Sequence, residues 1–134
     1  MTIDLSVAEP DAAAIAGAMA ALDAHFAALN AGDEAALAAT LHFPHYRLTG
    51  GRMQVWEQPD CYFVDFRKRA GDDWHHSVWD FRRVVAAGPD KVHFDVQFTR
   101  YRADGSAIGQ YRSLWVVTQL DGHWAAQLRS SFAA

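Results

Sequence analysis

Two dipeptides, Asp104-Gly105 and Asp121-Gly122, limit the fold of this chain more than any other feature. Each is flanked by strand-like segments of alternating polarity, the pattern of a two-residue β-hairpin turn. A further turn signal, Gly88-Pro89-Asp90, precedes them. The second half of the chain therefore predicts four antiparallel strands joined in a meander.

These turns also predict which side chains share a face of the sheet. Counting outward from each turn gives the following rows on one face: Val85, Val92, Val117 and Ala126; Arg83, Phe94, Trp115 and Leu128; Phe81, Val96, Ser113 and Ser130; Trp79, Phe98, Tyr111 and Phe132; Ser77, Arg100 and Gly109, with His75 beyond. Because a slip of one residue would scatter the aromatic residues over both faces, their agreement supports this register. We expect this face to be the inner one, and Leu114 and Val116 to form an apolar centre on the outer face.

The first part of the chain predicts helices. Ile15, Met19, Leu22, Phe26 and Leu29 follow one another at intervals of three or four residues, which is one stripe of an amphipathic helix. Shorter helices are expected over residues 34–41 and 59–69.

Gly50-Gly51 predicts a further hairpin, which pairs Leu48 with Met53 and Tyr46 with Val55. The other face of this hairpin carries His45, Arg47, Gln54 and Trp56. Hydrophobicity favours the first set as the inner face, but the position in the chain leaves both choices open.

Composition excludes several classes of protein. At 134 residues and a net charge of −4, we expect one domain over 1–134 and no nucleic-acid binding. The longest apolar run, residues 12–22, is shorter than the roughly 20 residues of a membrane span. An acidic N-terminus does not resemble a signal peptide, so a cytoplasmic location is expected. His75 and His76 point to opposite sides of a strand, so we expect no metal site, and no motif suggests a cofactor.

Two segments carry a resemblance to a known family. The first is His25-Phe26-Ala27-Ala28-Leu29-Asn30-Ala31-Gly32-Asp33 at the first helix junction, and the second is Asp121-Gly122-His123-Trp124 with Arg129-Ser130-Ser131 at the end. With the order of elements, they resemble a SnoaL-like member of the nuclear transport factor 2-like superfamily. The resemblance implies an α+β, cone-shaped barrel (a cystatin-like roll), in which a curved antiparallel sheet wraps the helices around an apolar cavity. It also implies a homodimer through the outer face of the sheet.

The rows then predict the site. Apolar rows close one end, and the other end carries Trp79, Phe98, Arg100, Ser113, Ser130, His75 and Ser77 as candidate ligand-binding residues. His25 and Tyr111 are the candidate catalytic residues, as proton donor or acceptor. We expect a small hydrophobic or aromatic ligand along Phe98, Trp79 and Phe81, and isomerase, dehydratase or cyclase chemistry. A non-catalytic dimeric binding module is the alternative.

Each candidate also has a structural interpretation. Ser113 and Ser130 could bond one another in a filled core, and His25 could bond a backbone carbonyl. Arg100 could pair with a carboxylate, bind an anionic ligand or reach solvent. Asp80 and Asp95 fall on the outer face, so the inward aspartate that ketosteroid-isomerase-like members use as a base is missing here.

Overall fold

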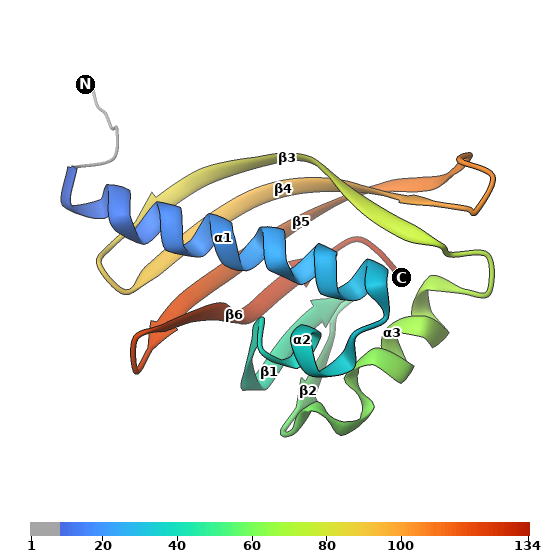
Figure 1. Ribbon diagram of the computed structural model, residues 1–134, viewed down its shortest axis with the longest axis horizontal. Coiled ribbons are helices and arrows are strands. Elements are labelled where there is room, and N and C mark those ends of the chain that lie inside the picture. Colours follow the sequence, from blue (N-terminus) through green and yellow to red (C-terminus); the bar gives the residue numbers. More distant parts are fainter. Residues whose placement is uncertain (1–8) are drawn as a thin grey trace.

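The computed structural model describes residues 9–134 of the chain (Figure 1). It has three α-helices, α1 (Glu9–Ala31), α2 (Glu34–Ala38) and α3 (Tyr62–Ala70), and a 3₁₀ turn over Pro59–Cys61 precedes α3. The strands are β1 (Leu41–Thr49), β2 (Arg52–Trp56), β3 (His76–Ala87), β4 (Lys91–Tyr101), β5 (Ala107–Leu120) and β6 (His123–Ser131).

The six strands form one curved, unclosed sheet in the order β2-β1-β6-β5-β4-β3. Every neighbouring pair is antiparallel except β1 and β6, which run parallel. Helix α1 lies along the concave side of the sheet, and α2 and α3 lie beside the C-terminal end of α1 (Figure 1). The expected α+β architecture is confirmed, and its hollow lies between α1, α3 and the sheet.

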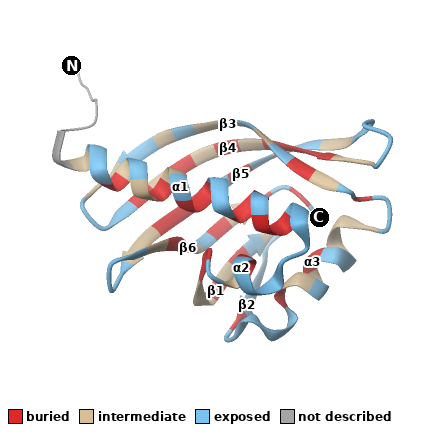
Figure 2. Cartoon of the chain, in the orientation of Figure 1, coloured by how far each residue is buried: buried red, intermediate tan, exposed pale blue. Residues whose placement is uncertain are grey.

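The hydrophobic core lies between the middle of α1 and the concave face of the sheet. Figure 2 shows buried residues on the face of α1 that is turned towards the sheet. Phe26 stacks on Trp79 with ring centroids 3.9 Å apart, and Trp79 also packs edge-on against Phe98 and Trp115. Residues 11–31 are long and apolar enough to cross a membrane by length and composition alone, but their buried face packs on this sheet.

The predicted register of β4 and β5 is confirmed. Phe94 pairs with Trp115, Phe98 with Tyr111 and Arg100 with Gly109. The pairing of Trp79 with Phe98 and of Ser77 with Arg100 is confirmed as well. These pairs place Ser77, Phe98 and Arg100 on the inner face of the sheet, as predicted.

The predicted register of β6 is wrong beyond Ala126. Val117 pairs with Ala126 as expected, but the register shifts there, so Trp115 pairs with Arg129 and Ser113 with Ser131. A β-bulge adds one residue to one strand and turns every later side chain to the other face. Leu128 and Ser130 therefore lie on the outer face, and Arg129 and Ser131 on the inner one.

Two further shifts change β3. They place Phe81 opposite Gln97 and Val84 opposite Phe94, so the predicted rows through Phe81, Arg83 and Val85 are wrong. Val85 is 60% exposed. The Phe81 ring lies under the guanidinium groups of Arg83 and Arg112 instead of facing the core.

The pairing of the first hairpin is confirmed, but the face that hydrophobicity favours is the wrong one. His45, Arg47 and Trp56 are buried, whereas Met53 and Val55 are exposed. The polar side chains find carbonyl acceptors inside: His45 bonds to Ala126 O and Arg47 to Ala133 O. Satisfied hydrogen bonds make this burial possible.

Candidate functional site

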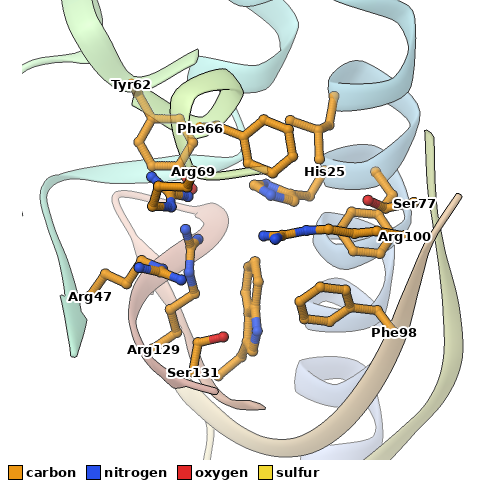
Figure 3. Close-up of a pocket in the computed structure, with 13 residues that line it drawn as sticks. His25, Arg47, Tyr62, Phe66, Arg69, Ser77, Phe98, Arg100, Arg129 and Ser131 are labelled. Atoms are coloured by element: carbon orange, nitrogen blue, oxygen red, sulfur yellow. The ribbon is translucent and has the colours of Figure 1, made fainter. Parts of the chain in front are cut away.

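A small pocket opens between α1, α3 and the inner face of the sheet (Figure 3). Side chains from two helices and five strands line it: His25, Phe26, Leu29, Arg47, Tyr62, Phe66, Arg69, Ser77, Phe98, Arg100, Trp115, Arg129 and Ser131. The free volume of the pocket is about 20 Å³. That is room for one or two water molecules.

Four arginines meet in this pocket. Arg47, Arg100 and Arg129 are 2%, 3% and 5% exposed, and Arg69 at the end of α3 is partly buried. Figure 3 shows Arg47, Arg69 and Arg129 on one side of the space and Arg100 entering from the other. Arginine is rarely buried without a partner of opposite charge.

None of the four arginines forms an ion pair with an Asp or Glu side chain in residues 9–134. The arginines that do are Arg82, Arg83, Arg102 and Arg112, all on other surfaces. Asp65 lies one turn before Arg69 on α3, but it accepts a hydrogen bond from Trp56 Nε1 instead. No Asp or Glu side chain in these residues therefore neutralises any of the four guanidinium charges, and Arg100 donates to an oxygen of Ala134 at 3.0 Å.

The pocket has an excess of hydrogen-bond donors. Within the described residues, the buried side-chain polar atoms without a partner are Arg69 Nε, Arg69 Nη1, Arg100 Nε and Trp115 Nε1. All four are N–H groups, and all three residues line this pocket. Unpartnered buried donors are rare in folded proteins, and they mark a place where an acceptor belongs.

Burial and mutual repulsion lower the pKa values of three of the arginines in this pocket. Burial lowers the pKa of Arg47 to about 9, and the neighbouring Arg69 and Arg129 add to this shift. Burial, with Arg129 as the next cause that lowers it, brings the pKa of Arg69 to about 10. Burial also lowers the pKa of Arg100, and the adjacent Tyr111 opposes that shift. An anion in the pocket would remove this mutual repulsion.

Arg129 is held by neutral groups on three sides. Its Nη1 donates to His45 Nε2 at 3.3 Å, and its guanidinium carbon lies 4.8 Å from the Trp115 ring centroid and 5.6 Å from that of Tyr62. His45 bonds to Ala126 O through Nδ1, so its Nε2 is the lone pair that accepts from Arg129. Burial and Arg129 keep the pKa of His45 well below its usual value.

His25 has one fixed tautomer. The Thr40 hydroxyl donates its single proton to Leu37 O at 2.7 Å, so it must accept the 2.8 Å hydrogen bond from His25 Nδ1. The proton of the imidazole is therefore on Nδ1, and Nε2 carries a lone pair. Burial, with Arg129 as a second cause, lowers the pKa of His25 to about 3. The ring points from α1 towards the arginines (Figure 3).

The structure brings together only part of the predicted site. His25, Ser77, Phe98 and Arg100 line the pocket. Trp79 and Tyr111 pack behind it, and Ser113 is buried and bonds to Ser130 O. Ser130 lies on the outer face, and His75 lies outside the pocket, next to His76.

Three of the four arginines were not predicted from the sequence. The strand pattern predicts Arg129 on the outer face, because the bulge in β6 has no sequence signature, and Arg47 lies on the face of the first hairpin that hydrophobicity disfavours. The pattern places Arg69 at the end of a short helix but does not predict which way its side chain points. The signal that did find the site was Arg100, whose strand neighbours Val96 and Phe98 are core residues.

No group of three or more His, Cys, Asp or Glu side chains in the described residues could hold a metal ion. The donor set of this pocket, which is dominated by guanidinium groups, repels cations as well.

No family model and no curated protein matches the chain. Solved structures do. An NTF-2-like protein of unknown function from Shewanella oneidensis MR-1 matches with a TM-score of 0.71 at 11% identity, over 89% of this chain and 98% of that one. A ketosteroid isomerase-like protein from Erwinia carotovora atroseptica matches with a TM-score of 0.64 at 19% identity, over 88% and 94%. The chain has the NTF2-like fold.

A putative calcium/calmodulin dependent protein kinase II association domain from Xanthomonas campestris shares this NTF2-like fold, with a TM-score of 0.64 and 24% identity over 98% and 95% of the two chains. The expected fold of the nuclear transport factor 2-like superfamily, a cystatin-like roll, is confirmed. Fold alone does not determine chemistry, so the function depends on the pocket.

The depressed pKa of His25 predicts acid sensitivity. An unfolded histidine has a pKa of about 6.5, so the unfolded chain binds the extra proton between about pH 6.5 and 3. The free energy of unfolding should therefore fall by up to about 1.4 kcal/mol per pH unit for this one group as the pH drops through that range.

His25→Asn, whose amide can still donate to Thr40, should make this fall shallower but not abolish it, because His45 contributes in the same direction. Urea unfolding between pH 4 and 8 measures the slope. An unchanged slope in the variant would show that His25 is not buried as the neutral form.

Proposed function

We propose that the chain binds a small organic anion, a carboxylate, in the arginine pocket. The observation that carries this proposal is the set of four guanidinium groups with no Asp or Glu partner in the described residues. Three of their N–H groups, and the indole N–H of Trp115 next to them, are buried without an acceptor. A carboxylate supplies negative charge and several acceptor sites at once, and it matches the planar fork of an arginine.

A second hollow shares two arginines with the pocket. Arg47 and Arg69 also line a neighbouring hollow between β1, β2 and α3, together with Thr49, Arg52, Met53, Gln54 and Ala134. The positive charge of these two arginines and of Arg52 attracts anions to this hollow in preference to neutral ligands.

The pocket is less suited to the hydrophobic or aromatic ligand that the sequence suggested. Trp79 packs against Phe98 and Trp115, and Phe26 packs against Trp79 and Phe98, so these rings fill the space where such a ligand would lie. Phe81 is on the other side of the sheet. The remaining space favours a ligand of a few non-hydrogen atoms over a ring system.

The site is also poorly arranged for acid–base catalysis by His25 and Tyr111. With its pKa near 3, His25 is a weak base in the ligand-free pocket, and Tyr111 lies behind Arg100 instead of lining the space. Binding is therefore the function that the geometry supports best. Isomerase, dehydratase or cyclase activity would require the bound anion to raise the pKa of His25.

A single substitution tests the carboxylate proposal. Arg69→Met keeps the aliphatic volume but removes one charge and two unpartnered donors. We expect acetate binding, measured by isothermal titration calorimetry, to weaken by about tenfold or more, because a charge-assisted hydrogen bond contributes about 1.5–3 kcal/mol. Without acetate, the variant should be at least as stable as the wild type, since repulsion is relieved.

The matched control is Arg67→Met, which removes the same charge from an exposed position on the same helix. It should bind acetate like the wild type. No heat of binding for wild-type protein at millimolar acetate, or equal weakening in both variants, would overturn the proposal.

We also propose that the outer face of the sheet associates with a second copy of this chain. An apolar groove lined by Tyr46, Leu48, Met53 and Leu128 lies on this face, and Phe132, 83% exposed, projects beside Leu114 and Ser130. A projecting ring and an apolar groove on one face can fill one another across a twofold axis. Arg112 and Asp95 at the same face supply both signs of charge for a polar rim.

Leu128→Glu tests this second proposal, with Val64→Glu on the exposed side of α3 as the control. At low micromolar concentration, the wild type and the control should sediment at twice the 14.9 kDa chain mass. Leu128→Glu should sediment as a monomer, since it places a charge in the apolar groove. A monomeric wild type would contradict the proposal.

A further inference from the structure

The arginine pocket contains one group that can only accept a hydrogen bond. Nδ1 of His25 holds the ring proton and gives it to Thr40, so Nε2 offers a bare lone pair. Within the described residues, Nδ1 is the only atom of the His25 ring that has a hydrogen-bond partner. The hydroxyl groups that line the same pocket, on Tyr62, Ser77 and Ser131, can donate as well as accept.

The ring that carries this acceptor shares a neighbour, Trp115, with Arg129. His25 packs edge-on against Trp115 with ring centroids 5.1 Å apart, and Arg129 lies over the same indole at 4.8 Å. Arg129 is also near enough to lower the pKa of His25. Figure 3 shows the His25 ring and the Arg129 guanidinium directed into the same space, so a ligand held there by Arg129 also faces His25.

A ligand made only of acceptor oxygens does not match this arrangement. Acetate, nitrate or sulfate can satisfy the guanidinium groups, but each would leave Nε2 without a donor. An ammonium group would supply a donor, yet it would bring a positive charge among four arginines. A neutral hydroxyl next to the carboxylate satisfies both requirements.

We propose that the pocket is selective for a short hydroxycarboxylic acid, whose carboxylate binds Arg129, Arg47 and Arg69 while its hydroxyl donates to His25 Nε2. This inference rests on the carboxylate-binding function proposed above and names its ligand class. Among hydroxycarboxylic acids, the shortest one, glycolate, with five non-hydrogen atoms, comes nearest to the small free volume of the pocket.

Three probes that differ in one group test the proposal. Glycolate, acetate and glycine share a carboxylate and carry a hydroxyl, a hydrogen and an ammonium group at the same carbon. By calorimetry at pH 7.5, glycolate should bind about threefold to tenfold more tightly than acetate, the contribution of one neutral hydrogen bond. Glycine should bind more weakly than acetate.

His25→Asn supplies the second arm. It keeps a donor for Thr40 but removes Nε2, so the ratio of glycolate affinity to acetate affinity should fall to about one. If acetate and glycolate bind the wild type equally, or if the variant retains the preference, the hydroxyl assignment is wrong and carboxylate binding stands. If none of the probes binds, both proposals fail. Should the variant not fold, the comparison of the probes on the wild type still decides the assignment.

Discussion

Four like charges held in one small pocket are the constraint on which the rest of this structure depends. Arg47, Arg69, Arg100 and Arg129 repel one another, and burial weakens the solvation that would otherwise stabilise each charge. The described residues compensate with other partners: oxygen atoms of Ala133 and Ala134, His45 Nε2, and the faces of Tyr62, Trp115 and Phe66. These dipoles and aromatic faces reduce the repulsion, but no Asp or Glu side chain of residues 9–134 takes part.

The fold explains how such a pocket can exist. Arginines reach it from β1, β4, β6 and α3, so no single element carries the whole charge. The tightly packed aromatic cluster around Phe26 and Trp79 anchors α1 to the sheet and supplies stability away from the pocket. Binding sites that strain the ligand-free protein are common, because stability and function place different demands on the same residues.

The sequence predicted the parts of this structure that follow from local rules. Turn dipeptides determine the register of β4 and β5, and this register placed Phe98 and Arg100 correctly on the inner face. The turn dipeptides do not predict the shift between β5 and β6. An extra residue in a strand is not visible in the sequence, because side chains still alternate regularly before and after the bulge. That shift decides whether Arg129 or Leu128 faces inward. Hydrophobicity misled at the first hairpin for a related reason: the inner face there is polar because it lines the pocket, while apolar residues cover the outer surface.

Bromide, a monovalent anion that can be located by anomalous diffraction, tests the central claim most directly. Crystals of the protein grown without carboxylates and soaked in sodium bromide should show a bromide peak between Arg47, Arg69 and Arg129, with Arg129 still stacked on Trp115. If bromide occupies only the exposed arginines on the surface and the pocket holds water alone, the four arginines do not form an anion site, and the proposed carboxylate binding is wrong.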